Sequence, residues 1–515
     1  MKFFDRTDDV TVSEGILKFL KLDDLLSIRN GNILDYLTTD IGILERRRRV
    51  VSDTSRIPGC AEIVEYLVKQ LTYISEITKK KSVSDVEERS LYSIRQTELY
   101  MEIVDRTAEF WKARREEFQS DDYRALFAHI LDICESSEYN NLKKGTARLI
   151  EDVTNVKSIS LGFNFDASLA PYEAGVISVN PYYIESGTLI DRLLRLDFDN
   201  KNVSMAPLVS AKKNARMEDF DAMEQSIYRA LGQVFKRAIR QWEPEVSAYI
   251  ADKLSFLIEA LPSFEFILKI NQITDRMKQA GLKLAEPVYC SMPERVLEAD
   301  GLYNPVLAIN LAEKGAGSCV TNDFRFDEQG TVYILTGPNN GGKSVFMSSV
   351  CIAQILAQLG MEVPAKRLRI SPVEGIFVHM PSYEGLNAKG RLMDECDKIK
   401  QIFEKMPEYS LAVFDETYSS TDPDDAIELS AHLVRALSAR RVRSIFGTHY
   451  HALKARLSEE ATEGVDYLTA GLDSDGRRTY QITRSTEDNA SDGFMIAEKM
   501  GVTFENLAKR NVGIE

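Results

Sequence analysis

Residues 331–344 have the sequence TVYILTGPNNGGKS, and this stretch decides how the C-terminal part of the chain is interpreted. An apolar, β-branched and aromatic run, typical of a buried strand, passes directly into a glycine-rich turn. Ser344 then opens an apolar-periodic stretch that ends at Gly360, as expected of a helix. The turn fits the pattern G-x-x-x-x-G-K-[ST] in its required strand–loop–helix setting. The stretch therefore predicts an α/β domain with a phosphate-binding loop.

The residue types of this loop are those that phosphate binding requires. Glycines let backbone N–H groups turn toward phosphate oxygens, and the N-terminus of the following helix adds its positive dipole end. We expect Lys343 to neutralise the β- and γ-phosphates during catalysis and Ser344 to offer its hydroxyl to Mg²⁺. ATP and Mg²⁺ are therefore the predicted cofactors. The predicted nucleotide-binding residues are Gly337, Pro338, Asn339, Asn340, Gly341, Gly342, Lys343 and Ser344.

A second apolar run, residues 411–414, ends in Asp415 and Glu416. A carboxylate at the C-terminal tip of a strand faces the phosphate loop across an open α/β sheet. We therefore expect Asp415 to hold Mg²⁺ together with Ser344, and Glu416 to orient and activate the attacking water. The alternative is a plain acidic turn after a strand, which the nearby phosphate loop disfavours.

A third strand is predicted at residues 444–447, and His449 follows it. In an ATPase, a histidine at this position can polarise the γ-phosphate or sense its loss, so His449 is a candidate catalytic residue. The alternative is a histidine that only caps or fills space. The remaining histidines have no such context and are expected to be structural: His129, His379, His432 and His451.

The region before this domain has a different pattern. Residues 14–150 are predicted to be mostly helical, with one long charged helix over residues 82–118. Period-two alternation predicts strands between about 155 and 206. An apolar stripe from 223 to 239 predicts a further helix.

These patterns divide a chain of 515 residues, long enough for several domains, into two regions. We predict a mainly helical region at 1–300, with a β-rich segment at about 155–206, followed by an α/β nucleotide-binding domain at 301–515.

Composition narrows the class of protein. The 64 Lys+Arg and 79 Asp+Glu give a net charge of −15, which excludes a generally basic nucleic-acid coat but not a local basic groove. The chain has no secretory-signal pattern and no apolar run long enough for a membrane span. The six cysteines are far apart and lack Cys-x-x-Cys spacing, so neither a zinc site nor a disulfide framework is expected. We expect a cytoplasmic protein without a membrane partner.

At its motifs the sequence resembles the MutS family of DNA mismatch-repair ATPases. Residues 336–344 are similar to the family's phosphate loop, 415–416 to its Walker B segment, and 447–450 to its switch segment. Residues 491–494 (SDGF) resemble the start of its closing helical segment, so the resemblance covers about 305–510. It implies a multidomain protein in which a long-helix lever and core region with a short β-rich insertion precedes an α/β P-loop ATPase domain of the ABC type.

The sequence also departs from this family's pattern. The mismatch-reading module should carry a Phe-x-Glu wedge near the N-terminus, and there is no room for the module before residue 14. Phe326-Asp327-Glu328 has matching letters but precedes the phosphate-loop strand, so we interpret it as strand-edge packing. The resemblance is therefore to a MutS-related protein without mismatch recognition.

A second departure concerns catalysis between subunits. The family's signature segment presents a serine to the γ-phosphate that the other subunit holds, and the similar stretch at 388–395 has Gly390 at that place. Gly390 is expected near the N-terminus of an amphipathic helix, whose N–H groups could still bind phosphate. Arg391 could supply charge in trans, like an arginine finger. The alternative is a solvated or acid-paired Arg391.

The function expected from these features is that of a homodimeric ATPase whose closure on ATP moves long helices on DNA. DNA binding, to duplex or branched forms, would depend on phosphate contacts and have weak sequence specificity. The candidate contacts, which could also be solvated helix faces, are Arg46–Arg49, Lys79–Lys81 and Arg114-Arg115. Two alternatives remain open: an ATP-gated scaffold for a protein or structured RNA, and a regulatory nucleotide switch with little turnover.

Overall fold

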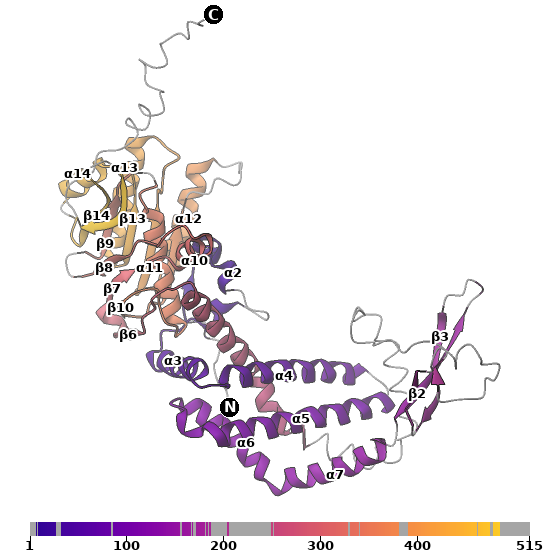
Figure 1. The fold of residues 1–515 in the computed structure, drawn as a ribbon. Coiled ribbons are helices and arrows are strands. Elements are labelled where there is room, and N and C mark those ends of the chain that lie inside the picture. Colours follow the sequence, from indigo (N-terminus) through magenta and orange to yellow (C-terminus); the bar gives the residue numbers. More distant parts are fainter. Residues whose placement is uncertain are drawn as a thin grey trace, which may run out of the picture. The chain divides into compact units, whose positions relative to one another are not determined.

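A computed structural model gives the fold of the chain (Figure 1). It describes residues 7, 9–26, 32–83, 86–154, 157–165, 167, 171–180, 182–183, 185–186, 203–204, 249–250, 252–327, 330–338, 340–380, 390–460, 462–473 and 477–484. The chain forms two compact units. Unit 1 comprises Met1–Phe3 and Ile57–Phe264, and unit 2 comprises Phe4–Arg56 and Glu265–Glu515.

These units do not coincide with the predicted regions 1–300 and 301–515, so that domain boundary stays a prediction. The helix predicted at 223–239 and the SDGF segment at 491–494 lie outside the described residues. Among the described helices, none has the length and apolarity needed to cross a membrane.

The described part of unit 1 consists mainly of helices. The sequence predicted this for residues 14–150. α4 and α5 lie side by side, and α6 packs along α5 (Figure 1). Aromatic rings fill the contact between α5 and α6, where Trp111 and Phe127 have ring centroids 5.8 Å apart. The bounds are α4 (Cys60–Val83), α5 (Val86–Arg114), η2 (Arg115–Glu117), α6 (Asp121–Glu135) and α7 (Ser137–Thr154). The helix predicted at 82–118 thus corresponds mainly to α5.

The strands predicted in the β-rich segment are present. β2 (Ser158–Phe165) and β3 (Pro171–Asn180) form an antiparallel pair in which Ser158 lies opposite Asn180. β4 (Glu185–Ser186) and β5 (Val203–Ser204) pair in parallel. The period-two alternation at residues 158–161 and 176–179 suits paired β-strands.

Unit 2 contains a seven-stranded sheet in the order β1-β11-β12-β13-β9-β14-β15. All neighbours pair in parallel except β14 and β15. The carboxyl ends of the parallel strands therefore meet at one edge, where ligands bind in such sheets. The bounds are β1 (Thr11–Val12), β9 (Val332–Thr336), β11 (Gly375–His379), β12 (Ser410–Asp415), β13 (Arg443–Gly447), β14 (Val465–Leu472) and β15 (Arg478–Arg484).

A second sheet and several helices complete unit 2. The second sheet has the order β6-β10-β7-β8, and Phe326 at the end of β8 is buried against Phe324 and Tyr333, which confirms strand packing for this residue. The remaining bounds are β6 (Pro287–Tyr289), β7 (Leu297–Leu302), β8 (Asn322–Phe326), β10 (Arg367–Ile370), α10 (Pro305–Lys314), α11 (Lys343–Gln358), α12 (Arg391–Lys405), α13 (Pro423–Ala439) and α14 (Ala452–Glu459).

The N-terminal segment belongs to unit 2 and completes its sheet. β1 extends the sheet by pairing in parallel with β11, with Thr11 opposite Gly375. α1 (Ile16–Leu20) packs against α11, and α3 (Ile41–Arg56) follows the short η1 (Ile33–Tyr36). Because α11 is covered on several sides, nearly all of its side chains are buried.

Candidate functional site

The phosphate loop lies between β9 and α11, in the strand–loop–helix setting that the sequence predicted. The five residues of β9 are all buried, and α11 begins at Lys343. Gly337 has φ +135, and a Cβ added there would lie 2.7 Å from Ala470 Cβ. Gly342 has φ +93, a conformation that side chains rarely adopt. Glycine is therefore required at both positions for this backbone shape.

Lys343 points back into its own loop. Its Nζ donates hydrogen bonds to Gly337 O at 2.8 Å and to Pro338 O at 3.3 Å. Burial lowers the pKa of Lys343, while the charges of Glu416 and Asp415 oppose that shift. A buried ammonium held by carbonyl oxygens at the end of a glycine-rich loop is suited to exchange those acceptors for phosphate oxygens.

Ser344 and Asp415 meet across the sheet edge. The Ser344 hydroxyl donates to Asp415 Oδ2 at 2.5 Å. Asp415 is 3% exposed, and its Oδ1 has no hydrogen-bond partner among the described residues. Burial raises the pKa of Asp415, and the Ser344 hydrogen bond lowers it. A hydroxyl and a buried carboxylate with a spare oxygen are the oxygen donors that Mg²⁺ prefers, so the residues present fit this ion.

The absence of a side chain at Gly447 leaves room for the Asp415 carboxylate. The sequence did not indicate this role. In the sheet Gly447 lies opposite Asp415. A Cβ at Gly447 would come within 2.8 Å of Asp415 Oδ1 and 2.7 Å of Met347 Cε. Only the pairing of β12 with β13 reveals this requirement.

Glu416 and His449 follow neighbouring strands and face each other. His449 Nδ1 lies 4.0 Å from Glu416 Oε1, and the two side chains are 46% and 33% exposed. The Glu416 N–H donates to Gly447 O at 2.9 Å. Glu416 also has φ 48, which a non-glycine residue adopts at an energetic cost. The two predicted catalytic side chains are thus close together.

A cavity of about 1050 Å³ opens over these residues. It is large enough for a nucleotide-sized ligand. Asn340, Gly341, Gly342, Lys343, Ser344, Asp415 and Glu416, all predicted from the sequence, line it. Residues that the sequence did not indicate line the rest, among them Tyr303, Leu307, Cys319, Asn322 and Tyr480. Asn339 lies outside the described residues, so its role stays a prediction.

Tyr480 was missed because its partner is distant in sequence. Asn322, on β8, accepts a hydrogen bond from Ile482 N–H at 2.7 Å and donates to Tyr480 O at 3.3 Å. Tyr480 has φ 58 and is 48% exposed beside the loop. The buried amide of Asn322 therefore holds the backbone at Tyr480, a residue that lines the cavity.

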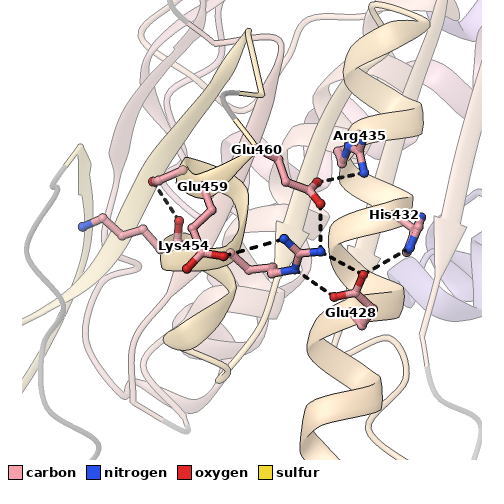
Figure 2. Close-up of polar contacts among 8 residues, drawn as sticks. Glu428, His432, Arg435, Lys454, Glu459 and Glu460 are labelled. Carbon is pink, nitrogen blue, oxygen red and sulfur yellow. Dashed lines mark hydrogen bonds and ion pairs between the residues drawn. The ribbon is translucent and has the colours of Figure 1, made fainter.

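The segment after His449 is anchored by an ion-pair network on the surface (Figure 2). Arg456 on α14 contacts Glu428 on α13 at 2.8 Å and Glu460 at 2.8 Å. Arg435 contacts Glu460 at 2.8 Å, and His432 contacts Glu428 at 3.3 Å. The network joins α13 to α14, the helix that follows the loop carrying His449.

Gly390 is the N-cap of α12, as predicted. It has φ 80, and a Cβ there would meet nothing within 4 Å. Arg391 is exposed and forms no ion pair within the described part of the chain. Neither residue lines the cavity that holds Lys343.

The basic clusters differ from what was expected of DNA contacts. Arg47 is fully buried, donates to Tyr36 O, and lies 5.5 Å from the centroid of the Phe266 ring. The suggestion that all of Arg46–Arg49 contact DNA is therefore wrong for Arg47, which packs in the core of unit 2. Arg114 is 39% exposed and pairs with Glu117 at 3.0 Å, which agrees with the solvated helix face given as the alternative.

Comparison with known proteins identifies the matching part of the chain. A family model described as MutS domain V matches residues 333–510. This part of the chain is therefore similar to MutS domain V. The matched residues include the phosphate loop from its strand onward, Asp415, Glu416 and His449, so MutS domain V contains all the residues that the sequence singled out for chemistry.

The chain is similar to an endonuclease MutS2 of Streptococcus gordonii, with 25% identity over 343 residues, 62% of this chain and 43% of that protein. It is also similar to a DNA mismatch repair protein MutS 1 of Halobacterium salinarum, with 33% identity over 190 residues, 36% of this chain and 22% of that protein. A MutS of Desulfovibrio desulfuricans is 35% identical over 145 residues, 27% of this chain and 16% of that protein. The alignments thus span less than half the length of these relatives.

Proposed function

We propose that unit 2 binds Mg·ATP in the cavity beside the phosphate loop and hydrolyses it to ADP and phosphate. The observation that supports this most is the convergence of Lys343, Ser344 and Asp415 on one cavity, with one buried oxygen of Asp415 unpartnered. That MutS-family proteins are ATPases adds support.

The triphosphate would lie along the loop from Gly337 to Ser344. Backbone N–H groups and the Lys343 ammonium would bind its oxygens, since charge-assisted hydrogen bonds are the strong ones. Ser344 and Asp415 would hold Mg²⁺, which when bound neutralises charge on the β- and γ-oxygens. The nucleoside would face the wall that includes Tyr480 and Leu307.

Catalysis would depend on Glu416 and His449. Glu416 would orient and deprotonate the attacking water, and its partly exposed position in the cavity wall would let water reach it. His449, 4.0 Å from Glu416, would hydrogen-bond the γ-phosphate and help to fix the Glu416 carboxylate. Lys343 would stabilise charge that develops on the phosphate oxygens.

Replacement of Lys343 tests this function. Lys343→Ala should weaken Mg·ATP binding by roughly 10- to 100-fold, because a hydrogen bond to a charged group contributes roughly 1.5–3 kcal/mol, and it should abolish hydrolysis. The matched control is Lys400→Ala on α12, whose side chain is 74% exposed. Calorimetric titration and phosphate release measure the two effects. Undiminished affinity and turnover in Lys343→Ala would refute the proposal.

We further propose that the protein acts as a homodimer on DNA, where ATP favours a closed form and so moves the helices of unit 1. The relatives named DNA mismatch repair proteins support this extension. A ligand shifts such an equilibrium only by its differential affinity for the two forms. Sedimentation of the wild type with ATP, and with duplex, branched and structured-RNA probes, tests it. A monomer that binds none of the DNA forms would contradict it.

Gly390 favours a second candidate function, a nucleotide switch with little turnover. The residue provides no hydroxyl at the N-cap of α12. Single-turnover phosphate release separates a switch from a working ATPase, because a switch would release phosphate no faster than the Glu416→Gln variant.

Arg391→Ala tests the in-trans role of Arg391. It should abolish turnover and leave ATP affinity nearly intact, and unchanged turnover would exclude that role.

A further inference from the structure

The loop that follows Asp415, residues 416–421, has an unfavourable backbone on both sides of Thr417. Glu416 has φ 48 and Tyr418 has φ 64, although neither is glycine. Such conformations are costly for a residue with a side chain and persist only where neighbouring groups hold them. Because Glu416 is the proposed catalytic base, the contacts that hold this loop also decide where its carboxylate lies.

The two residues with positive φ are held by the sheet and by the core. The Glu416 N–H donates to Gly447 O at 2.9 Å, at the end of β13. Tyr418 is 6% exposed and belongs to a hydrophobic cluster that includes Phe377 of β11 and Phe414 of β12. The residue between them is held by a contact of a different kind.

Thr417 forms a hydrogen bond with His379, the last residue of β11. The distance between Thr417 Oγ1 and His379 Nδ1 is 3.0 Å, and the two residues are 1% and 3% exposed. Burial lowers the pKa of His379 to about 4, so the ring is neutral at pH 7. Depending on the tautomer, Nδ1–H donates to the hydroxyl or the hydroxyl donates to Nδ1. A bond between two neutral side chains, shielded from water, therefore links β11 to the loop.

Packing alone does not explain a polar pair at this place. His379 Nε2 has no hydrogen-bond partner among the described residues, and a buried nitrogen without a partner is costly. Apolar side chains of similar size would fill the same space without that cost. Met380, which follows His379, lines the cavity, and so does Glu416, which precedes Thr417. Polar groups retained at such a cost are expected where function sets the geometry.

We propose that Thr417 and His379 are positioning residues whose hydrogen bond holds the backbone beside Glu416 in the geometry that catalysis requires. The inference rests on the proposed ATPase function. Neither residue is among those that line the cavity, so loss of their bond should impair hydrolysis and not ATP binding. From the sequence alone His379 was expected to be structural, and its contact with Thr417 gives it this further role.

Replacement of Thr417 tests the inference in the full chain. Thr417→Val keeps the shape of the side chain but removes the hydroxyl, so kcat should fall by about tenfold or more while the ATP Kd stays within about twofold. Thr417→Ser retains the hydroxyl and should recover most of kcat. A wild-type kcat in Thr417→Val, or a kcat loss accompanied by an equal loss of ATP affinity, would overturn the proposal.

The matched control is Thr97→Val on α5. Thr97 is also fully buried, and its hydroxyl donates to Ser93 O at 2.7 Å. The same substitution there also removes a buried hydrogen bond, but it should leave kcat unchanged. A similar kcat loss in Thr97→Val would mean that a general loss of stability lowers turnover, which would overturn the proposal.

Replacement of His379 provides an independent test if Thr417→Val does not fold. His379→Leu removes both ring nitrogens and should lower kcat by a similar factor, whereas His379→Asn offers an amide near the position of Nδ1 and should recover part of the loss. The double variant His379→Leu/Thr417→Val should be no slower than either single variant, because both remove the same bond. Independent, multiplying effects on kcat would overturn the proposal.

Hydrogen exchange separates this inference from the proposed function. Without nucleotide, the Glu416 amide should exchange about tenfold or more faster in Thr417→Val than in the wild type, because its bond to Gly447 O opens more often when the next residue is not held. This result would support the link between β11 and the loop even if the wild type showed no ATP hydrolysis, which would refute the proposed function alone. Equal exchange in the two proteins would overturn the link.

Discussion

At the scale of single residues, the chemistry of the site depends on how charged groups are buried. Asp415 is a carboxylate with one hydrogen-bonded oxygen and one unpartnered oxygen, and Lys343 is an ammonium held by carbonyls of its own loop. Such groups are costly to bury unless a ligand completes them. A ligand with negatively charged oxygens would suit the Lys343 ammonium, and a bound cation would suit the Asp415 carboxylate.

Replacement of Glu416 should separate binding from turnover. Glu416→Gln keeps the size of the side chain but removes the base, so turnover should fall by roughly 10²- to 10⁴-fold, the usual contribution of general base catalysis. ATP affinity should stay within a few-fold, because Lys343 and Ser344 are unchanged. Steady-state phosphate release measures turnover, and calorimetric titration measures ATP affinity. A parallel loss of affinity would contradict the role given to Glu416.

A methyl group at Gly447 should disturb Asp415. In Gly447→Ala the new Cβ would lie 2.8 Å from Asp415 Oδ1, so the carboxylate must move. The Mg²⁺ concentration for half-maximal ATP binding should rise by roughly tenfold, equivalent to about 1.4 kcal/mol. With EDTA, when no metal is present, the variant and the wild type should bind ATP equally weakly. An unchanged Mg²⁺ requirement in Gly447→Ala would contradict the role of the Asp415 carboxylate in holding Mg²⁺.

His379 should make stability depend on pH. Burial lowers the pKa of His379 to about 4, from an ordinary value of 6.5. The unfolded chain therefore binds more protons between these values, so the stabilisation is present above pH 6.5 and is lost as the pH falls toward 4. Between pH 7 and pH 5 this amounts to a loss on the order of 2 kcal/mol.

The measurement is urea unfolding at pH 7 and pH 5. The His379→Asn variant should not show the loss of unfolding free energy that His379 causes between pH 7 and pH 5, because asparagine does not take up a proton in this range. The matched control, His432→Asn, replaces a side chain that is 64% exposed and should keep the wild-type pH dependence. Equal pH dependence in His379→Asn and the wild type would contradict the assignment.

At the scale of elements, the position of α11 depends on buried amides at its C-terminal end. Gln358 Nε2 donates to Thr38 O at 3.0 Å and to Val373 O at 2.9 Å, and its Oε1 accepts the Val373 N–H at 3.1 Å. One side chain thus joins α11 to the N-terminal segment and to the connection that leads from β10 to β11. The helix that begins with Lys343 is held at its far end by this contact.

Loss of the Gln358 amide should destabilise unit 2. Gln358→Met fills similar volume but leaves the Thr38 and Val373 backbone groups unsatisfied, which should lower the free energy of unfolding by roughly 2–4 kcal/mol. The control is Gln401→Met on α12, which is exposed and should have little effect. Urea unfolding measures both. A loss below about 0.5 kcal/mol in Gln358→Met would indicate that the network contributes little.

At the scale of the whole molecule, charge sets the conditions for the proposed DNA binding. The chain has a net charge of −15, so favourable contacts with DNA must come from local cations rather than from the overall field. Arg47 is not among them, because it is buried in unit 2. Any DNA affinity would therefore come from a limited set of phosphate contacts.

Binding of duplex DNA by ATP-loaded Glu416→Gln should fall steeply with salt. If about six phosphates are contacted, the affinity should drop roughly 10³-fold between 50 and 200 mM salt through release of counterions. Fluorescence anisotropy with duplex, branched DNA and structured RNA measures this effect. Binding that did not depend on salt, or that was confined to RNA, would favour the scaffold alternative.

Local sequence was sufficient for the elements that carry the motif. β9, the phosphate loop and α11 follow from a short apolar run, glycines and helical periodicity, because each of these signals lies within a few residues. Asp415, Glu416 and His449 were predicted for the same reason, since each follows an apolar run that forms a buried strand. The helices of unit 1 and the β2–β3 pair were also predicted from local periodicity.

What only the tertiary structure decided are the contacts between residues far apart in the chain. The neighbourhood of Gly447 and Asp415, and the hydrogen bond from Asn322 to Tyr480 O, have no local signal, because the packing of distant strands brings these residues together. The same holds for Arg47, whose arginine-rich surroundings suggest a surface although its side chain is buried. Periodicity reports which face of an element is apolar, whereas the partner of that face is set by packing of the whole chain.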